Sequence, residues 1–477
     1  MKKLIAIFVN CTIAYVSVAQ NNVSINNTGA TPDASAMLDI QSTTKGLLTP
    51  RLTQAQRIVI VNPATGLLVF QTDGGQGLYF NAGTAVSPNW ITSWNIGGNT
   101  GTNPATNFLG TIDNNPLNFR VNNLNAGQIH PVNGSVFLGL RAGQSNNTSY
   151  SNVGIGTGAL QLNFTHNNLV AIGDSALFNN GTGFLVVNDA HSNTAIGSKA
   201  LFANTSGANN TATGFRALYN TNIGHTNTAN GASALFTNTA GDNNVAVGSQ
   251  ALYNTNANTN TAVGRSALFS NTTGTGNTAI GDNVNVTAGT YTNTTTIGAT
   301  ASSTASHQVR IGNAFVTSIG GVVDWTIVSD GRFKKNIENN VQGLAFILKL
   351  KPVTYTLDVH GLENFIWPGN SRYAHMDAKE MNETKAFMEE GMNAKEKIIN
   401  TGFIAQDVEV AARETGFDFS GVDTPKNERD FYGLRYAQFV VPLVKAVQEQ
   451  QQQIQTLKQE NNSLRNELEL IKRKLGL

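Results

Sequence analysis

The sequence is poor in cysteine, in charge and in long apolar runs. Its 477 residues include one cysteine, Cys11, and 13% charged residues, where ordinary globular proteins have about 25%. Cys11 lies in a segment that we expect to be removed, so the mature chain would form neither disulfides nor thiolate metal sites. The seven histidines show no metal-ligand spacing, and we assign no metal and no cofactor. No stretch after the first 19 residues is long and apolar enough to span a membrane.

The shortage of charge is confined to one part of the chain. Residues 20–323 contain 17 charged residues, with eight Asp and no Glu, whereas residues 324–477 contain 42. The chain therefore consists of two parts of different composition, which join near Asp324. Net charge is near zero in both, which argues against a nucleic-acid partner held through its phosphates. The first part offers no carboxylate pair in a plausible cleft, which disfavours a multi-turnover glycan hydrolase.

The first 19 residues have the pattern of a secretory signal peptide. The basic Met1–Lys3 precedes an apolar run over 4–18, and Ser17–Ala19 is a small-x-small cleavage site. A membrane anchor is the alternative, but the run is short for a span and Asn10 interrupts it. We therefore expect a secreted or cell-surface protein.

Residues 20–130 are rich in Asn, Thr and Gly, and turn residues separate short apolar runs such as 66–70 and 77–80. This pattern predicts small β modules. Trp90 and Trp94 suit either a sugar-stacking platform or the packing of such a module. The sequence from Met37 to Ile40 and from Thr44 to Arg51 resembles the opening module of secreted fibre proteins with a tail-fibre-type C-terminus.

The region 131–300 is a repeat array. Its marker glycines are spaced by 17 residues, with one interval of 24 and one of 16: Gly139, Gly156, Gly173, Gly197, Gly214, Gly231, Gly248, Gly264, Gly281 and Gly298. The segment 193–202 is echoed by 260–269. A 17-residue unit is too short to bury a core alone, whereas stacked units bury one together, so we predict a β-solenoid or β-roll. A connector, 301–323, would follow.

Each repeat has two apolar stretches, Ala-Ile-Gly and Ala-Leu-Phe/Tyr, between Asn, Thr and Gly turns. We expect two short strands per coil, with apolar side chains inward and hydroxyl or amide side chains outward. Ladders of Asn and Thr on stacked coils can satisfy one another by hydrogen bonding. The repeats resemble the heads of trimeric autotransporter adhesins, which implies left-handed β-rolls associated as trimers. Adhesion to a surface glycan or host ligand and a stiff spacer both stay open.

Three motifs follow in order in the charged part: 328–337 with Ser-Asp-x-Arg-x-Lys, 401–409, and 434–436 before a helical run over 437–449. Together they resemble the peptidase S74 family, the intramolecular chaperone domain that ends phage tail spikes and tail fibres. The resemblance covers about 324–450. It implies a small α/β domain, here 324–442, that trimerises, helps fold the fibre upstream and then cuts itself off.

The resemblance places cleavage between Val328 and Ser329, with the Ser329 hydroxyl as nucleophile and Lys334 as its base. A hydroxyl is a poor nucleophile until its proton is removed. A lysine removes it only when neutral, which requires a pKa lowered by burial or a nearby cation. Arg332 and Lys335 are adjacent cations. Five residues span about 140° of a helix, so the pair needs a loop or strand end to meet.

Four further residues belong to the motifs with less defined roles. Asp330 and Arg332 would orient the scissile turn, pair across subunits or form a structural ion pair. Gln406 and Asp407 would support the site from a second segment or fix the fold. The polar stretch 376–397 is predicted to be a helical insertion.

The last segment, 443–477, has a strict heptad pattern. Position a holds Val447, Ile454, Asn461, Leu468 and Leu475, and position d holds Leu443, Gln450, Leu457, Leu464 and Ile471. This predicts a parallel coiled coil rather than an amphipathic helix packed on a globular core. Asn461 at a favours a dimer, whereas both resemblances favour a trimer, and we expect a homotrimer.

The sequence thus predicts a mainly β, secreted, trimeric fibre or adhesin-like protein whose S74 domain cleaves itself as a single-turnover serine autoprotease. The alternative is a fibre that is never cut and keeps its C-terminal trimerisation domain.

Overall fold

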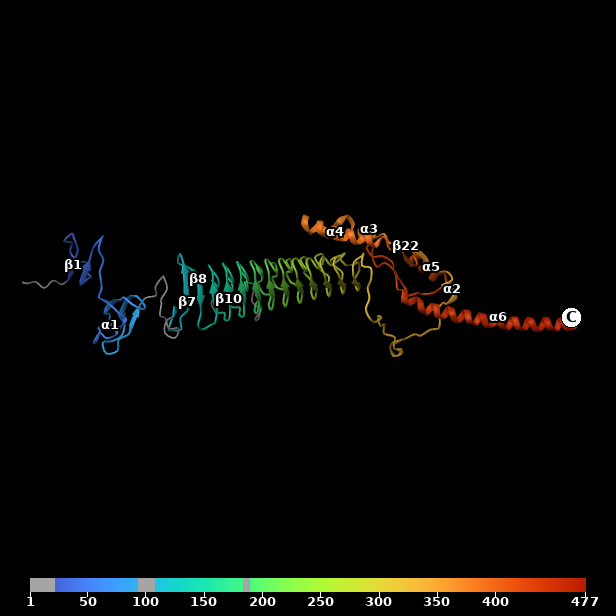
Figure 1. Cartoon of the computed structure of the whole chain (residues 1–477), viewed down its shortest axis with the longest axis horizontal. Coiled ribbons are helices and arrows are strands. Elements are labelled where there is room, and N and C mark those ends of the chain that lie inside the picture. The colour runs from blue at the N-terminus through green and yellow to red at the C-terminus, as the bar shows by residue number, and fades with distance from the viewer. Residues whose placement is uncertain (1–21, 93–107, 147, 183–188) are drawn as a thin grey trace, which may run out of the picture. The chain divides into compact units, whose positions relative to one another are not determined.

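The computed structural model describes residues 22–92, 108–146, 148–182 and 189–477. The chain has two compact units, 1–110 and 111–477, shown in Figure 1. The predicted signal peptide and Trp94 lie outside the described residues. No helix in these ranges is long and apolar enough to cross a membrane.

The first unit contains two small sheets. Its elements are β1 (Val23–Ile25), β2 (Leu38–Ile40), β3 (Arg51–Leu52), α1 (Gln54–Ile58), β4 (Leu68–Gln71), β5 (Gly77–Asn81) and β6 (Trp90–Thr92). β1 pairs with β2, and β3–β4–β5–β6 form the second sheet. The buried Arg57 donates to Gln71 at 2.8 Å and lies over the rings of Tyr79 and Trp90. This contact favours the packing interpretation of Trp90.

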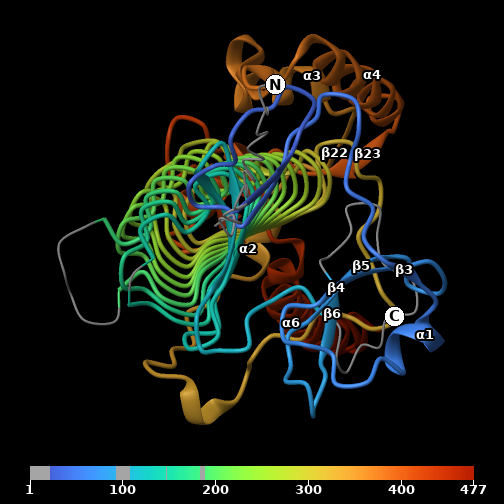
Figure 2. The same cartoon turned by 90° about the vertical axis from the view of Figure 1, so that its left-hand side faces the viewer.

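The second unit begins with a solenoid whose strands form one 13-stranded sheet. β7 (Leu117–Val121), β8 (Leu124–Ile129) and β9 (Val136–Leu138) are antiparallel neighbours. From β9 onward the pairing is parallel, one strand per coil, through β10 (Val153–Ile155), β11 (Val170–Ile172), β12 (Thr194–Ile196), β13 (Thr211–Thr213), β14 (Thr228–Asn230), β15 (Val245–Val247), β16 (Thr261–Val263), β17 (Thr278–Ile280), β19 (Thr295–Ile297) and β21 (Val309–Ile311). The coils stack in register (Figures 1 and 2).

The marker glycines stand where successive coils come closest. Gly197 has φ +134°, and a Cβ there would lie 2.4 Å from the carbonyl oxygen of Gly214 in the next coil. Only glycine tolerates both this backbone conformation and this approach. The glycine spacing in the sequence therefore reports the stacking of coils.

The predicted solenoid is confirmed, but three details of its coils were wrong. The Ala-Leu-Phe/Tyr stretch is a turn, because its leucine has positive φ, as at Leu201 and Leu218. Among the coil residues that the structure describes, only β18 (Asn285–Val286) and β20 (Ser302–Ser303) pair as a second, short sheet. Amide side chains also point inward. The asparagines before the strands are fully buried and form a ladder: Asn193, Asn210, Asn227, Asn244, Asn260 and Asn277.

Within that ladder each amide supports the next coil. The Asn210 side-chain oxygen accepts from the backbone N–H of Asn227 at 2.9 Å, and Asn227 accepts likewise from Asn244 at 3.0 Å. Alanines and leucines fill most of the apolar interior, and a second set of buried polar side chains includes Asn180, Asn204 and Asn238. The third residue of most strands faces outward instead and is an exposed isoleucine or valine, as at Ile196 and Ile280.

The charged C-terminal block is mixed α/β, as predicted. Its elements are η1 (Gly331–Phe333), α2 (Leu344–Ile347), β22 (Val353–Tyr355), α3 (Val359–Ile366), η2 (Pro368–Tyr373), α4 (Ala378–Lys395), β23 (Asn400–Gly402), α5 (Ala405–Glu414), β24 (Val422–Asp423), β25 (Gly433–Leu434), η3 (Tyr436–Phe439) and α6 (Val440–Leu475). One core lies around Phe346, Val408 and Phe439, and a second lies between α3 and α4 around Val359 and Met388. The predicted helical insertion is α4.

The last helix, α6, runs for 36 residues. Only Pro442 and Ala446 of it are buried. The apolar a and d side chains from Val447 to Leu475 are therefore exposed in a single chain.

Candidate functional site

The Ser-Asp-x-Arg-x-Lys motif lies in the connection between β21 and α2. Residues 316–340 are exposed except for the half-buried Asp330, and Figures 1 and 2 both show this connection looping away from the neighbouring elements. Within it Asp330 is the N-cap of η1, because its side chain accepts from the backbone N–H of Arg332 at 2.9 Å. Asp is a favoured N-cap residue, so the motif itself forms the turn.

This turn brings the predicted catalytic pair together. Lys334 is extended at the C-cap of η1, and its Nζ donates to Ser329 Oγ at 2.9 Å. A five-residue spacing that a continuous α-helix would keep apart is thus bridged by a single 3-10 turn. Both side chains are exposed, so water reaches the pair in a single chain.

Asp330 and Arg332 form an ion pair within the same turn. Arg332 Nη2 lies 2.6 Å from Asp330 Oδ2. Hydrogen bonds from the Arg332 side chain and backbone lower the pKa of Asp330 below its usual value. The ion-pair interpretation of the two residues is therefore the one that fits a single chain, and Arg332 is engaged beside the dyad.

Gln406 and Asp407 are not brought to the pair. They lie in the first turn of α5, and no hydrogen bond or ion pair among the described residues joins either to Ser329 or Lys334. Asp407 at a helix N-terminus has a favourable interaction with the helix dipole.

Apolar side chains lie on both sides of the Val328–Ser329 peptide bond without being buried. Val328 is 83% exposed and Trp325 80%, and Ile327, Phe333 and Ile337 are also exposed. Several large apolar side chains on one short loop are unusual for a finished surface. The loop therefore lacks, in one chain, the surroundings that would desolvate Lys334.

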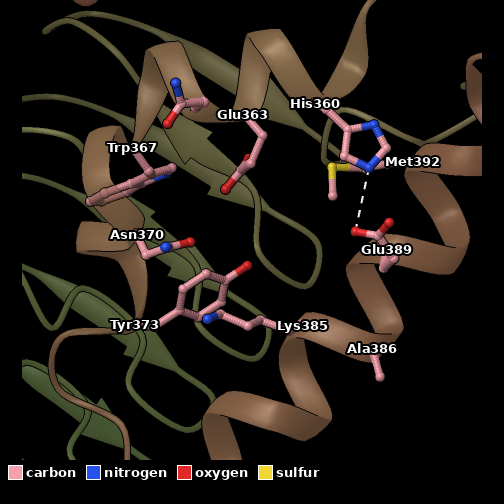
Figure 3. Close-up of a pocket in the computed structure, with 10 residues that line it drawn as sticks. His360, Glu363, Trp367, Asn370, Tyr373, Lys385, Ala386, Glu389 and Met392 are labelled. Atoms are coloured by element: carbon pink, nitrogen blue, oxygen red, sulfur yellow. Dashed lines mark hydrogen bonds and ion pairs between the residues drawn. The ribbon is translucent and has the colours of Figure 1, made fainter.

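A pocket of about 440 Å³ lies apart from this loop, between α3, η2 and α4 (Figure 3). Its charged groups already have partners. His360 contacts Glu396 at 2.7 Å and Glu389 at 3.4 Å, and its hydrogen bond with Glu396 raises the pKa of His360. No motif in the sequence marks this pocket. Nowhere in the described ranges do three or more His, Cys, Asp or Glu side chains gather to hold a metal ion.

Comparison with known families identifies two parts of the chain. Residues 329–417 match the model of the chaperone of endosialidase, peptidase S74, and residues 24–106 match that of a phage tail-like trimerisation region. Neither a search of curated proteins nor one of solved structures found a match. The S74 match begins at Ser329, and the trimerisation region supports a homotrimer. The chain therefore carries a peptidase S74 domain on a phage-tail-fibre-like trimeric protein.

Proposed function

We propose that this protein is an extracellular trimeric fibre whose S74 domain assists folding of the solenoid and then cuts the Val328–Ser329 bond. The observation that carries the proposal is the 2.9 Å contact between Lys334 Nζ and Ser329 Oγ. It occurs at the first residue of the S74 match.

The proposed reaction begins when neutral Lys334 takes the Ser329 hydroxyl proton and Oγ bonds to the carbonyl carbon of Val328. The carbon–nitrogen bond then breaks, and the Lys334 ammonium returns the proton to the leaving nitrogen, which leaves an ester between Val328 and Ser329 Oγ. Water hydrolyses the ester to a Val328 carboxyl group and a free Ser329 hydroxyl. The serine is the new N-terminus, so each chain reacts once.

Assembly would supply what the single chain lacks. A lysine is neutral near pH 7 only when burial or a nearby cation lowers its pKa. Packing of the exposed Trp325, Phe333 and Ile337 against neighbouring chains would exclude water from Lys334. Cleavage would then await the trimer.

Two exposed apolar rows support a trimer. The a and d side chains of α6 are exposed along the whole helix after Ala446, which supports the predicted coiled coil. A second row runs along the solenoid sheet and includes Ile155, Ile196, Ile280 and Ile311. Three copies aligned by their coiled coils would start the stacking of solenoids at a lower entropic cost.

The outer face of the solenoid favours a stiff spacer over a glycan-binding surface. One aromatic ring per coil stacks on the next from Phe178 to Phe269, with centroids 5.0–5.4 Å apart. Stacked rings cover one another's faces, and the faces are what a sugar would need. The second candidate function, a fibre that is never cut, is favoured by the solvent exposure of the dyad.

Intact mass of the expressed protein tests the proposal, with wild type beside Ser329→Ala and Lys334→Ala. We expect wild type to give one fragment ending at Val328 and one starting at Ser329, and both variants to stay whole. Lys397→Ala is the matched control, because it removes an exposed lysine of the same block that lies outside the motif, and it should still be cut. Full-length wild type in a trimeric sample would favour the uncut fibre.

A further inference from the structure

The C-terminal block contacts the last coils of the solenoid through residues that lie outside the sequence motifs. Figures 1 and 2 show α3 and α4 alongside those coils. We call these contacts the docking surface. Its members upstream of the scissile bond are Arg265, Phe269, Asn283, Thr287, Thr300, Ser302, Thr304, Gln308, Arg310, Phe315 and Val316, and those downstream are Trp367, Arg372, His375, Glu380, Phe387, Gly391, Lys395, Asn427, Arg429 and Asp430.

The apolar part of the docking surface centres on Phe315. This side chain packs into the core between α3 and α4, beside Met388 and Met392, and meets Phe387 edge-on at 5.5 Å. Gly391 leaves room for it, since a Cβ there would lie 2.3 Å from the Phe315 ring. Phe315 thus completes the interior of a block that begins after the scissile bond.

The polar part uses buried, charge-assisted contacts. The Arg372 side chain is 4% exposed and pairs with Glu363 at 2.6 Å. It donates to the Thr300 carbonyl at 2.8 Å, and Trp367 Nε1 donates to Ser302 Oγ at 3.0 Å. Separating Arg372 from the Thr300 carbonyl would leave a buried donor without its acceptor, which is energetically costly.

A second segment, 427–430, also contacts the last coils. Asn427 and Arg429 donate to the carbonyls of Thr304 and Thr287 at 2.8 and 2.9 Å. Asp430 accepts from Thr304 Oγ1 at 2.7 Å. His375 meanwhile stacks on Phe269 at 4.1 Å and extends the aromatic row of the solenoid.

From these contacts we infer that the C-terminal block stays bound to the fibre after the Val328–Ser329 bond is cut. The docking surface pairs residues numbered 265–316 with residues numbered 367–430, and none of its contacts runs through the exposed connection 317–340. Cutting that connection removes the covalent link and leaves the contacts of the docking surface intact. The S74 block would then continue to cover the last coils of the solenoid. The inference rests on the proposed cleavage only for the origin of the cut.

The test therefore makes the cut independently. A recognition sequence for a site-specific protease is inserted between Gly320 and Gly321 of the full-length Ser329→Ala chain, where no contact is disturbed. After digestion, denaturing gels report the cut and size-exclusion chromatography at about 1 µM reports retention. We expect the two fragments to co-elute. Elution of a free C-terminal fragment would overturn the inference, whereas an uncut wild type would bear only on the proposed function.

Two variant pairs test the docking surface. Phe315→Ala should raise the dissociation constant at least about tenfold, and Val323→Ala, an exposed apolar residue in the same connection, should not change it. Arg429→Ala should raise it a few-fold beside an unaffected Arg413→Ala in α5. Circular dichroism shows whether each variant folds. A folded Phe315→Ala with unchanged retention would contradict the role of the docking surface.

Discussion

The solenoid coils and the connection that carries Ser329 belong to one unit. They differ in how their hydrogen-bonding groups are paired and in whether their apolar side chains are buried. In the coils, the buried Asn ladder and the parallel strands join backbone groups of one coil to the next. In the connection, residues 317–340, the side-chain hydrogen bonds join residues at most five positions apart, and large apolar side chains face water. The coils bury apolar side chains within their own chain, whereas the connection leaves Trp325, Phe333 and Ile337 exposed.

The largest expected effect comes from a glycine at a coil contact. Gly197→Val would place a side chain 2.4 Å from the Gly214 carbonyl oxygen at positive φ. Overpacking and backbone strain together should lower the free energy of unfolding by about 4 kcal/mol. Gly276→Ala is the control, because its φ is +67° but its Cβ would meet nothing closer than 4.0 Å. It should cost about 1 kcal/mol in urea denaturation, and equal losses would refute the close-contact explanation.

A smaller loss is expected from the Asn ladder. Asn227→Ala removes the acceptor of the Asn244 backbone N–H and the donor to the Gly241 carbonyl, both at buried positions. Unsatisfied buried groups cost about 1–3 kcal/mol each, so the free energy of unfolding should fall by about 3 kcal/mol. Thr228→Ala, at the next, exposed position, should change it by less than about 0.5 kcal/mol. If Asn227→Ala left the free energy of unfolding unchanged, the ladder would not be what stabilises the stacked coils.

The docking surface should respond to pH through His375. Burial and the nearby Arg265 lower the pKa of His375, while Glu380 and Asp282 oppose the shift and Arg372 adds to it. The undocked histidine, with an ordinary pKa near 6.5, is protonated first. Docking is therefore strongest above about pH 6.5 and weakens as pH falls below it, by up to about tenfold per unit.

Fragment retention measured from pH 7.5 to 5 checks this dependence. His375→Phe keeps the stack on Phe269 and should flatten the profile. A profile that is already flat in the wild-type sequence would show that His375 is not held neutral by docking.

The smallest effect on stability, and the sharpest contrast with the coils, is expected in the connection. Trp325→Ser should leave the unfolding free energy of an isolated chain within about 0.5 kcal/mol, because the side chain is 80% exposed. The same change should slow cleavage in the trimer about tenfold or more, if neighbouring chains pack on it to exclude water from Lys334. Thr317→Ser, also exposed in this connection, is a suitable control. Unchanged cleavage in Trp325→Ser would remove this residue from the assembled site.

Much of this division could be read from the sequence, for physical reasons. The glycine period reports coil contacts directly, so the solenoid was predictable. The inward asparagines and the turn at Ala-Leu-Phe/Tyr were not, because a leucine at positive φ leaves no mark in composition. The contact between Ser329 and Lys334 was expected from the family resemblance of the three motifs and not from the spacing of the two residues. The contacts of Arg372 and Phe315 were missed. Arg372 donates to the backbone carbonyl of Thr300, which is distant in the sequence, and Phe315 fills the space that Gly391 leaves. Neither a backbone carbonyl nor this space has a sequence signal.

The most direct test of assembly-dependent cleavage is an intact-mass time course on separated monomeric and trimeric fractions of the wild-type chain. We expect the fragments that end at Val328 and begin at Ser329 to accumulate in the trimeric fraction alone. Cleavage at this bond in a monomeric fraction that stays monomeric, or a trimeric fraction that stays whole, would contradict the claim that neighbouring chains complete the site.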